Sequence, residues 1–310
     1  MTKRSSAPPS VKDEKAEVVL RKLELTVKRK LDGLLFGNHL GLVPGPGSEP
    51  GESRIYHPGD DVRRMDWFVT ARTTTPHVRE TVADRELETW LVVDLSPSLD
   101  FGTADCEKRD LAVAAAAAFV YLTQHGGNRV GAIITTGEDT IRIPALPGKA
   151  HGDWIIRKII ATPRAKEGTR GDLGAALEEL RRPERKRGLI VVISDFLGDP
   201  TWTRPMTGLQ ARHDIIGIEI VDPRELSLPD VGLVMLTDPE TGRQIEVQTA
   251  SKQLRDQFAA EAETQRAEIA AGLRRSGSSH LRLRTDRDWL HDIMRFVAHR
   301  RRGTVGGVVR

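Results

Sequence analysis

The chain has 310 residues, of which 38% are hydrophobic, 29% charged and 5% aromatic, and its formal net charge is +3. This length and composition are typical of a folded chain with one or two ordinary cores, which excludes a wholly disordered protein. The longest apolar run, 111–122, is shorter than the roughly 18 residues of a membrane span, and residues 1–30 lack the apolar stretch of a signal sequence. The single cysteine, Cys106, cannot form an internal disulfide, so we expect a reducing compartment, the cytoplasm.

Basic residues gather at the two ends of the chain. Residues 1–30 hold nine lysines and arginines against four acidic residues, and residues 300–310 hold four arginines and no acidic residue. Between these ends, acidic residues outnumber basic ones. A nucleic-acid-binding domain is expected to carry basic side chains on its folded surface, with aromatic side chains among them. We therefore predict no nucleic-acid partner.

The first 85 residues divide into two segments. Within residues 1–37, apolar residues recur every four positions among charged ones from Val19 to Leu35, which predicts an amphipathic helix after a basic tail. Residues 38–85 begin with a loop rich in glycine and proline and continue as short strands joined by a Pro-Gly-Asp turn. We interpret this second segment as a small, mainly β element.

From residue 86 to residue 300, predicted strands and helices alternate. Strands are expected at 90–93, 129–135, 140–143, 188–193, 214–220 and 281–283. Helices are expected at 108–123, 154–160, 173–181, 251–273 and 288–299. Because the strands are apolar on both faces, the alternation predicts an α/β domain with a doubly wound, mostly parallel sheet covered by helices on both sides.

A predicted β-hairpin at 231–248 interrupts this alternation. We expect it to pack with residues 38–85 rather than to extend the main sheet. Residues 301–310 follow the domain as a basic tail.

Polar residues follow two of the predicted strands at their carboxyl ends. The strand at 90–93 runs into the sequence Asp-x-Ser-x-Ser, and the strand at 188–193 runs into Ser-Asp. Open α/β sheets bind ligands at the carboxyl ends of their strands. Two carboxylates and a few hydroxyls form a hard oxygen site that suits Mg²⁺, with Mn²⁺ as a possible substitute. The candidate metal ligands are Asp94, Ser96, Ser98 and Asp195.

Asp-x-Ser-x-Ser after an apolar strand, with Ser194-Asp195 about a hundred residues later, resembles the metal-ion-dependent adhesion site of von Willebrand factor A-like domains. The upstream segment 56–67, Tyr-His-Pro-Gly-Asp-Asp-Val-Arg-Arg-Met-Asp-Trp, with Ala71-Arg72, resembles the fingerprint of the bacterial family known as domain of unknown function 58. Members of that family carry such an A-like domain and are typically encoded beside MoxR-type AAA+ ATPases. The resemblance spans about residues 30–300 and implies an ATPase of this type as a partner.

The resemblance also implies roles for the site residues. In A-like domains, the serines and a threonine from a second loop bind the metal directly, the aspartates bind it directly or through water, and a partner protein supplies an acidic ligand. Here Gly171 stands directly before the Asp172-Leu173 pair that opens the next helix, and the nearest threonine is Thr169. Either Thr169 reaches the metal through a looped-out 170–171, or the site lacks this ligand.

The fingerprint segment is dense in charges of both signs. They are carried by Asp60, Asp61, Arg63, Arg64, Asp66 and Arg72. We interpret these residues as a self-neutralising ion-pair network that braces a turn, with Trp67 as its apolar anchor. A surface that docks a partner is the alternative.

The sequence contains no motif of a common enzyme class. It has no Gly-x-x-x-x-Gly-Lys-Ser/Thr loop, no His-Glu-x-x-His, no Gly-x-Ser-x-Gly and no cysteine and histidine cluster. We predict a non-catalytic, metal-dependent adaptor. The resemblance adds that it links a MoxR-type ATPase to client proteins bearing an acidic residue, during complex assembly or maturation.

Three alternatives stay open at the level of the sequence. The side chains of the Asp-x-Ser-x-Ser loop could cap free backbone N–H groups and have no other role. Asp94 could be the nucleophile or a metal ligand of a Mg²⁺-dependent phosphoesterase. The protein could also be a scaffold with a vestigial metal site. The oligomeric state is left open.

Overall fold

The structure is a computed structural model that describes most of the chain in two units. The described residues are 8–11, 16–35, 50–56, 62, 65–81, 88–124, 128–166, 168–181, 188–239 and 241–305. Contacts between residues divide the chain into a main unit, Met1–Val43 with Leu87–Arg310, and a small unit, Pro44–Glu86.

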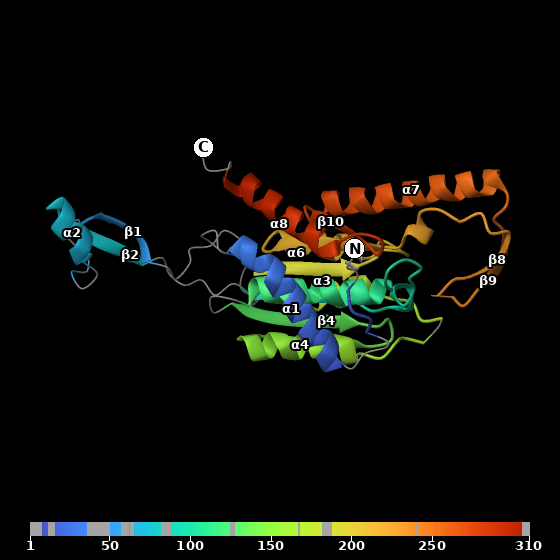
Figure 1. The fold of residues 1–310 in the computed structure, drawn as a ribbon, viewed down its shortest axis with the longest axis horizontal. Helices are drawn as coiled ribbons and strands as arrows, with labels where there is room; N and C mark the ends of the chain where they lie inside the picture. Colours follow the sequence, from blue (N-terminus) through green and yellow to red (C-terminus); the bar gives the residue numbers. More distant parts are fainter. Residues whose placement is uncertain are drawn as a thin grey trace, which may run out of the picture. The chain divides into compact units, whose positions relative to one another are not determined.

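The main unit is built on a six-stranded sheet (Figure 1). In spatial order its strands are β10 (Ser279–Arg284), β7 (Asp214–Val221), β6 (Gly188–Ser194), β3 (Glu88–Asp94), β4 (Arg129–Thr135) and β5 (Thr140–Pro147). All neighbouring strands are parallel except β4 and β5. The chain begins in the middle of the sheet with β3, adds β4 and β5 on one side, and then adds β6, β7 and β10 on the other. The predicted doubly wound, mostly parallel sheet is confirmed.

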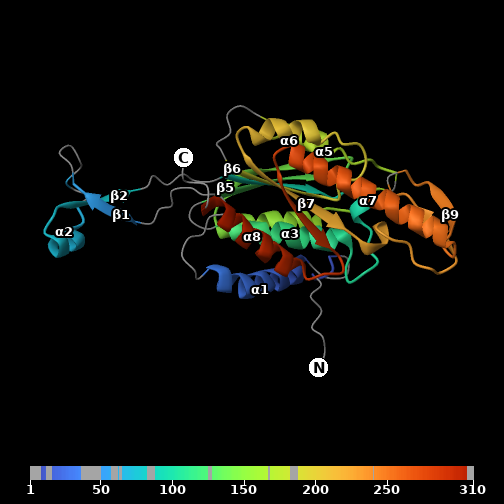
Figure 2. The ribbon, with the colours of Figure 1, turned by 90° about the horizontal axis from the view of Figure 1, so that it is seen from above.

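Helices cover both faces of this sheet (Figure 2). One face carries α3 (Lys108–Thr123), α4 (Lys149–Ala161) and α8 (Trp289–Val305), with α1 (Ala16–Leu35) outside α3. The other face carries α5 (Leu173–Glu178), α6 (Thr203–Gln210) and α7 (Lys252–Arg275). Because each strand serves two cores, successive residues are buried on opposite faces, which explains the continuous apolar runs in the sequence. None of the helices in the described part of the chain combines the length and the apolar character that crossing a membrane requires.

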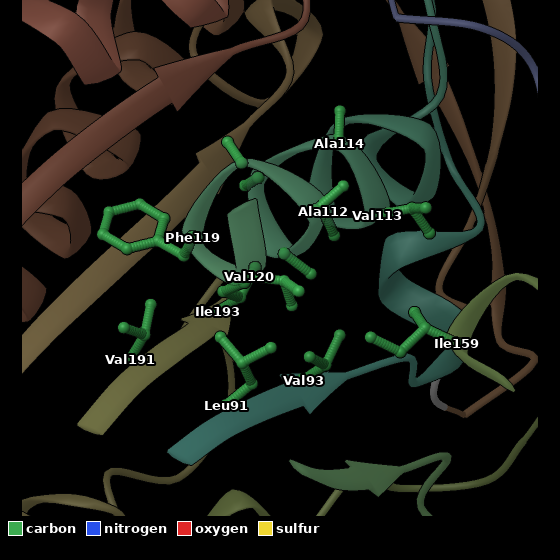
Figure 3. Packing of buried hydrophobic residues seen from close by; sticks show 14 of the residues in the cluster. Leu91, Val93, Ala112, Val113, Ala114, Phe119, Val120, Ile159, Val191 and Ile193 are labelled. Atoms are coloured by element: carbon green, nitrogen blue, oxygen red, sulfur yellow. The ribbon is translucent and has the colours of Figure 1, made fainter. Parts of the chain in front are cut away.

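Helix α3 is buried on all sides. Six of the seven residues at 112–118 are alanines, and Figure 3 shows this helix lying over Leu91 of β3 and Val191 of β6. Short side chains let the helix approach the sheet closely, and a helix that is apolar all round needs a cover on its outer face as well. Helix α1 provides that cover.

Helix α1 is part of the main unit. Its apolar stripe at four-residue spacing places Val19, Leu23 and Val27 in the same core as α3 and α8. The predicted boundary at residue 37 therefore does not separate α1 from the α/β domain, because this stripe completes the core of the domain.

The small unit holds β1 (Pro50–Ile55), α2 (Trp67–Thr73) and β2 (His77–Thr81), and the two strands pair antiparallel. Asp66 caps α2: its carboxylate accepts hydrogen bonds from Phe68 N at 3.1 Å and Val69 N at 3.2 Å. Trp67 is 68% exposed, so its predicted role as an apolar anchor is wrong. The buried position at this turn is taken by the capping aspartate instead.

The ion-pair network predicted for the fingerprint segment lies largely outside the described residues. This is the case for Asp60, Asp61, Arg63 and Arg64. Of the remaining members, Asp66 caps α2 and Arg72 is exposed on the same helix. The network and its alternative, a docking surface, both stay predictions.

The predicted hairpin is present as β8 (Leu233–Thr237) and β9 (Gln244–Gln248). The two strands form a sheet of their own and do not extend the six-stranded sheet, as the sequence predicted. The expected packing against residues 38–85 stays a prediction, because the main unit and the small unit are each described by themselves.

Replacement of Leu23 by alanine tests whether α1 belongs to the core. Leu23 is 1% exposed, whereas Leu25 on the same helix is 60% exposed. Leu23→Ala is expected to lower the free energy of unfolding by about 2–5 kcal/mol, because it leaves a cavity in the core. The matched control, Leu25→Ala, is expected to change it by less than about 0.5 kcal/mol. Denaturant titration measures both values, and equal effects would contradict the assignment of α1 to the core.

Candidate functional site

The candidate site lies where the order of the strands reverses, between β3 and β6. Open α/β sheets bind ligands at such a point, outside the carboxyl ends of the strands. Strands β3 and β6 are parallel neighbours, with Val93 opposite Ile193. The next residues, Asp94 and Ser194, therefore adjoin, and the Ser194 hydroxyl donates a hydrogen bond of 2.8 Å to Asp94 Oδ2.

The Asp-x-Ser-x-Ser loop gathers three polar side chains at the end of β3. Asp94 Oδ1 accepts a hydrogen bond of 2.9 Å from Ser96 N, and the short 3-10 helix η2 (Pro97–Leu99) follows. Ser96 Oγ and Ser98 Oγ lie 3.1 Å apart, and all three side chains are buried. One carboxylate and two hydroxyls therefore lie close together at the end of β3, and the Ser98 hydroxyl also makes a hydrogen bond to Asp195.

Capping accounts for only part of this loop. Asp94 accepts a hydrogen bond from the backbone two residues later, as a turn-forming aspartate does. Ser96 is the N-cap residue of η2, but its side chain makes no capping hydrogen bond. The hydroxyls of Ser96 and Ser98 lie against each other instead, so capping does not explain the two serines.

Asp195 follows β6 and is held by a buried lysine. Lys108, the first residue of α3, is fully buried, and its Nζ lies 2.8 Å from Asp195 Oδ2. Asp195 Oδ1 accepts a hydrogen bond of 3.1 Å from Leu197 N. Both oxygens of this carboxylate are therefore engaged within the protein.

The ion pair keeps both of its members charged. Burial by itself would raise the pKa of Asp195, but the charge and hydrogen bond of Lys108 outweigh it, so the pKa lies below its ordinary value. Burial likewise opposes the charged form of Lys108, yet Asp195 and Glu225 hold its pKa above the usual range. Lys108 is therefore a permanent counter-ion of Asp195.

This ion pair is one end of a larger buried network. Lys108 also pairs with Glu225, whose other oxygen accepts a hydrogen bond of 2.8 Å from Arg266 Nη2 on α7. Arg266 Nη1 lies 3.2 Å from Glu219 Oε1, in the middle of β7. Sequence reasoning missed these residues, although a glutamate inside an otherwise apolar strand does indicate that a buried partner exists.

Asp94 lacks such a partner. Among the described residues, no basic side chain pairs with it, and its side chain accepts hydrogen bonds from Ser96 N, from Ser194 Oγ and from the Ser96 hydroxyl. Burial and the negative charge of Asp195 raise the pKa of Asp94 above its ordinary value. Asp94 is therefore a buried carboxylate whose charge is not compensated, and a cation beside it would be stabilised.

A cavity of about 360 Å³ opens over these residues. Asp94, Ser96 and Asp195 line it, together with the loop before α5 and the turn of the β8–β9 hairpin. One basic residue, Arg170, lines the cavity, against five acidic ones, which are Asp94, Asp172, Asp195, Asp199 and Asp238. The excess of carboxylates favours cations in this cavity.

The structure does not bring Thr169 to the other candidates. Its hydroxyl donates a hydrogen bond of 3.3 Å to Glu138 Oε1, and the cavity lining does not include it. Gly171 faces the Asp-x-Ser-x-Ser loop instead: a Cβ atom built there would lie 3.0 Å from Ser96 Cβ and 3.7 Å from Asp94 Oδ1. The position from which a second-loop hydroxyl could reach Asp94 is therefore occupied by glycine.

The donors suit a hard divalent cation with few protein ligands. Asp94, Ser96 and Ser98 offer oxygen atoms only, which Mg²⁺ and Mn²⁺ accept. The carboxylate of Asp195 is engaged by Lys108 Nζ and Leu197 N and is not counted among these donors. No three histidine, cysteine, aspartate or glutamate side chains cluster as a metal site within the described ranges. The residues thus fit an ion such as Mg²⁺, which keeps several water ligands.

The chain is similar to known proteins in both sequence and fold. The family described as "Protein of unknown function DUF58" matches residues 52–268. The "Uncharacterized protein Rv1480" of Mycobacterium tuberculosis is 59% identical over 307 residues, which cover 97% of this chain and 96% of that protein. Among solved structures, the conserved hypothetical protein BatB from Bacteroides thetaiotaomicron is 13% identical, with a TM-score of 0.44, and covers 70% of this chain and 99% of that chain. The SpRpn10 VWA domain is 11% identical, with a TM-score of 0.36, and covers 67% of this chain and 93% of that chain.

The fold prediction rests on the topology of the sheet. The order β10-β7-β6-β3-β4-β5, with one antiparallel strand at the edge and helices on both faces, confirms the predicted von Willebrand factor A-like class. The family match includes the fingerprint segment 56–67 and spans more than half of the chain. This chain belongs to the DUF58 family.

Proposed function

We propose that this protein is a non-catalytic adaptor that binds partner proteins through a divalent cation held at Asp94, Ser96 and Ser98. The observation that supports this function best is the uncompensated carboxylate of Asp94, buried beside two hydroxyls that cap nothing and open to an acidic cavity. A carboxylate of this kind is costly without a cation, and two hydroxyls beside it are suitable further ligands.

The charges around the cavity give such a site a preference for acidic ligands. Lys108 already neutralises Asp195, so Asp94 offsets only one of the two positive charges of the ion. The ion then keeps about one uncompensated charge toward the open side of the cavity. A glutamate or aspartate of a client protein completes the coordination shell of the ion, whereas a lysine provides no ligand for it.

The same charges disfavour the enzymatic alternative. A phosphoesterase must accept a negatively charged phosphate, yet the lining residues include five carboxylates and a single arginine, Arg170. This excess of negative charge opposes a phosphate, which carries up to two negative charges, more strongly than it opposes the single charge of a protein carboxylate. Binding of a protein carboxylate therefore requires less positive charge in the cavity than binding of a phosphate.

Calorimetric titration with Mg²⁺ and Mn²⁺ tests the metal site. The unmodified protein is expected to bind either ion with a dissociation constant on the order of 1 mM, because few protein ligands are available. Asp94→Asn keeps the shape of the side chain but removes its charge, and it is expected to weaken binding at least about 10-fold. The control Asp199→Asn, another carboxylate of the cavity, is expected to stay within about 3-fold.

Two results would contradict the metal site. One is the absence of Mg²⁺ and Mn²⁺ binding at 10 mM, far above the expected constant of about 1 mM. The other is unchanged binding in Asp94→Asn. Mg²⁺-stimulated phosphatase turnover that disappears in Asp94→Asn would instead establish the phosphoesterase.

Gly171 offers a test in the opposite direction. Gly171→Ser places a hydroxyl next to Ser96 and Asp94 and is expected to tighten Mg²⁺ binding about 10-fold, the effect of roughly one added polar ligand. Gly171→Ala introduces the same Cβ contact with Ser96 and no oxygen, so it is expected to bind Mg²⁺ no more tightly than the unmodified protein. Equal affinities of the two variants, measured by calorimetry, would show that residue 171 does not face the ion.

We further propose that a MoxR-type AAA+ ATPase is a second partner and that the pair acts in the assembly or maturation of client complexes. Support for this partner is the family resemblance alone. Purification of the tagged protein from its native cell is expected to recover the ATPase with and without a chelator, and clients only with Mg²⁺, because only the clients would bind through the ion. Mass spectrometry identifies both, and a preparation free of any AAA+ ATPase would contradict the partnership.

A further inference from the structure

The β8–β9 hairpin exposes a row of apolar side chains next to the cavity. Val231, Leu233 and Met235 are 63%, 60% and 56% exposed. Leu233 and Met235 stand at alternate positions along β8, so they project from the same face of the hairpin, and Val231 lies just before the strand. On this face the cross-strand neighbours of Leu233 and Met235 are polar, Gln248 and Glu246. Folding of the main unit alone leaves this apolar row uncovered.

The hairpin is also an incomplete sheet. In the part of the chain that the structure describes, β8 pairs with β9 and with no other strand. A two-stranded hairpin is marginal by itself, and a third strand is the usual way to stabilise it. An open strand edge is a template for an added strand, and main-chain hydrogen bonds then supply much of the affinity.

The turn of the hairpin is part of the wall of the cavity. Asp238 and Thr241 of this turn line the same cavity as Asp94. Gly168 N donates a hydrogen bond of 3.1 Å to Pro239 O, which joins the turn to the loop that contains Gly171. Figure 1 shows the hairpin at the N-terminal end of α7, outside the six-stranded sheet. Since β8 runs toward this turn, a segment that lies along β8 has one end close to the candidate metal site.

We infer that the hairpin binds an extended segment of the partner protein, which adds a third strand along the open edge of β8. Apolar side chains at every second position of that segment contact Leu233 and Met235. The five residues of β8 span about 17 Å, so a segment of roughly seven or eight residues covers the strand and reaches the cavity. An aspartate or glutamate at the end nearer the turn enters the cavity. The acidic residue rests on the proposed function, whereas the strand addition rests on the hairpin.

A displayed library of random twelve-residue peptides, selected on the full-length protein in Mg²⁺, tests the inference. Enriched peptides are expected to alternate apolar and polar residues and to carry an aspartate or glutamate beyond the alternating stretch. The affinity of a synthetic, fluorescently labelled copy is measured by anisotropy. The double variant Leu233→Lys, Met235→Lys is expected to weaken its binding at least 10-fold. Leu25→Lys, an exposed leucine on α1, is the matched control and is expected to leave binding unchanged.

Backbone methylation of the peptide separates strand addition from mere apolar contact. In a strand, alternate N–H groups point to the neighbouring strand and to solvent. Methylation of the set of alternate N–H groups that points to β8 is therefore expected to abolish binding. Methylation of the other set, which points to solvent, is expected to leave the affinity within about 3-fold. A peptide that still binds when either set of N–H groups is methylated would overturn the inference.

The remaining outcomes separate this inference from the proposed function. Binding that is lost in Leu233→Lys, Met235→Lys but is the same in Mg²⁺, in a chelator and in Asp94→Asn would support the added strand and reject the metal. Failure to enrich any peptide, or equal binding to the double variant and to Leu25→Lys, would overturn the inference. A dimer in solution that the double variant dissociates would assign the hairpin to a second copy of the chain and overturn it as well.

Discussion

The close packing of helix α3 between the sheet and helix α1 sets the geometry of the main unit. Its alanines let the helix approach β3 and β6, and no larger side chain fits between these layers without displacing one of them. The position of the helix fixes that of its first residue, Lys108, whose ammonium group lies at the carboxyl end of β6. The charge distribution at the candidate site therefore depends on the packing of alanines that lie about one to three helical turns further along α3.

Two aspartates that look equivalent in the sequence meet opposite surroundings in the fold. Both follow apolar strands and both are buried, but Asp195 is paired with Lys108 and Asp94 is not. Burial raises the pKa of Asp94, whereas the ammonium group more than reverses the same effect at Asp195. The two carboxylates therefore differ in role: Asp195 belongs to the internal ion-pair network, whereas Asp94 has no basic partner among the described residues.

Much of this arrangement could be predicted from the sequence, because periodicity and strand ends are local signals. The alternation of apolar strands with helices fixes the doubly wound class, and the rule for strand ends brings Asp94 and Asp195 together. The pairing of Lys108 with Asp195 joins residues 87 positions apart and has no local signature. Residue type alone suggested Trp67 as an anchor, and the resemblance left Thr169 open as a ligand; neither indicates the direction in which a side chain points.

The lysine that neutralises Asp195 has a consequence for how the protein responds to its surroundings. In small zinc domains the metal supplies the free energy of folding, so that removal of the ion unfolds the chain. Here the counter-ion of Asp195 is covalently part of the polypeptide, and the core beneath it is built from apolar side chains of the chain itself. Under the proposed function, changes in the supply of divalent ions would therefore alter how much of the protein is bound to partners rather than how much of it is folded.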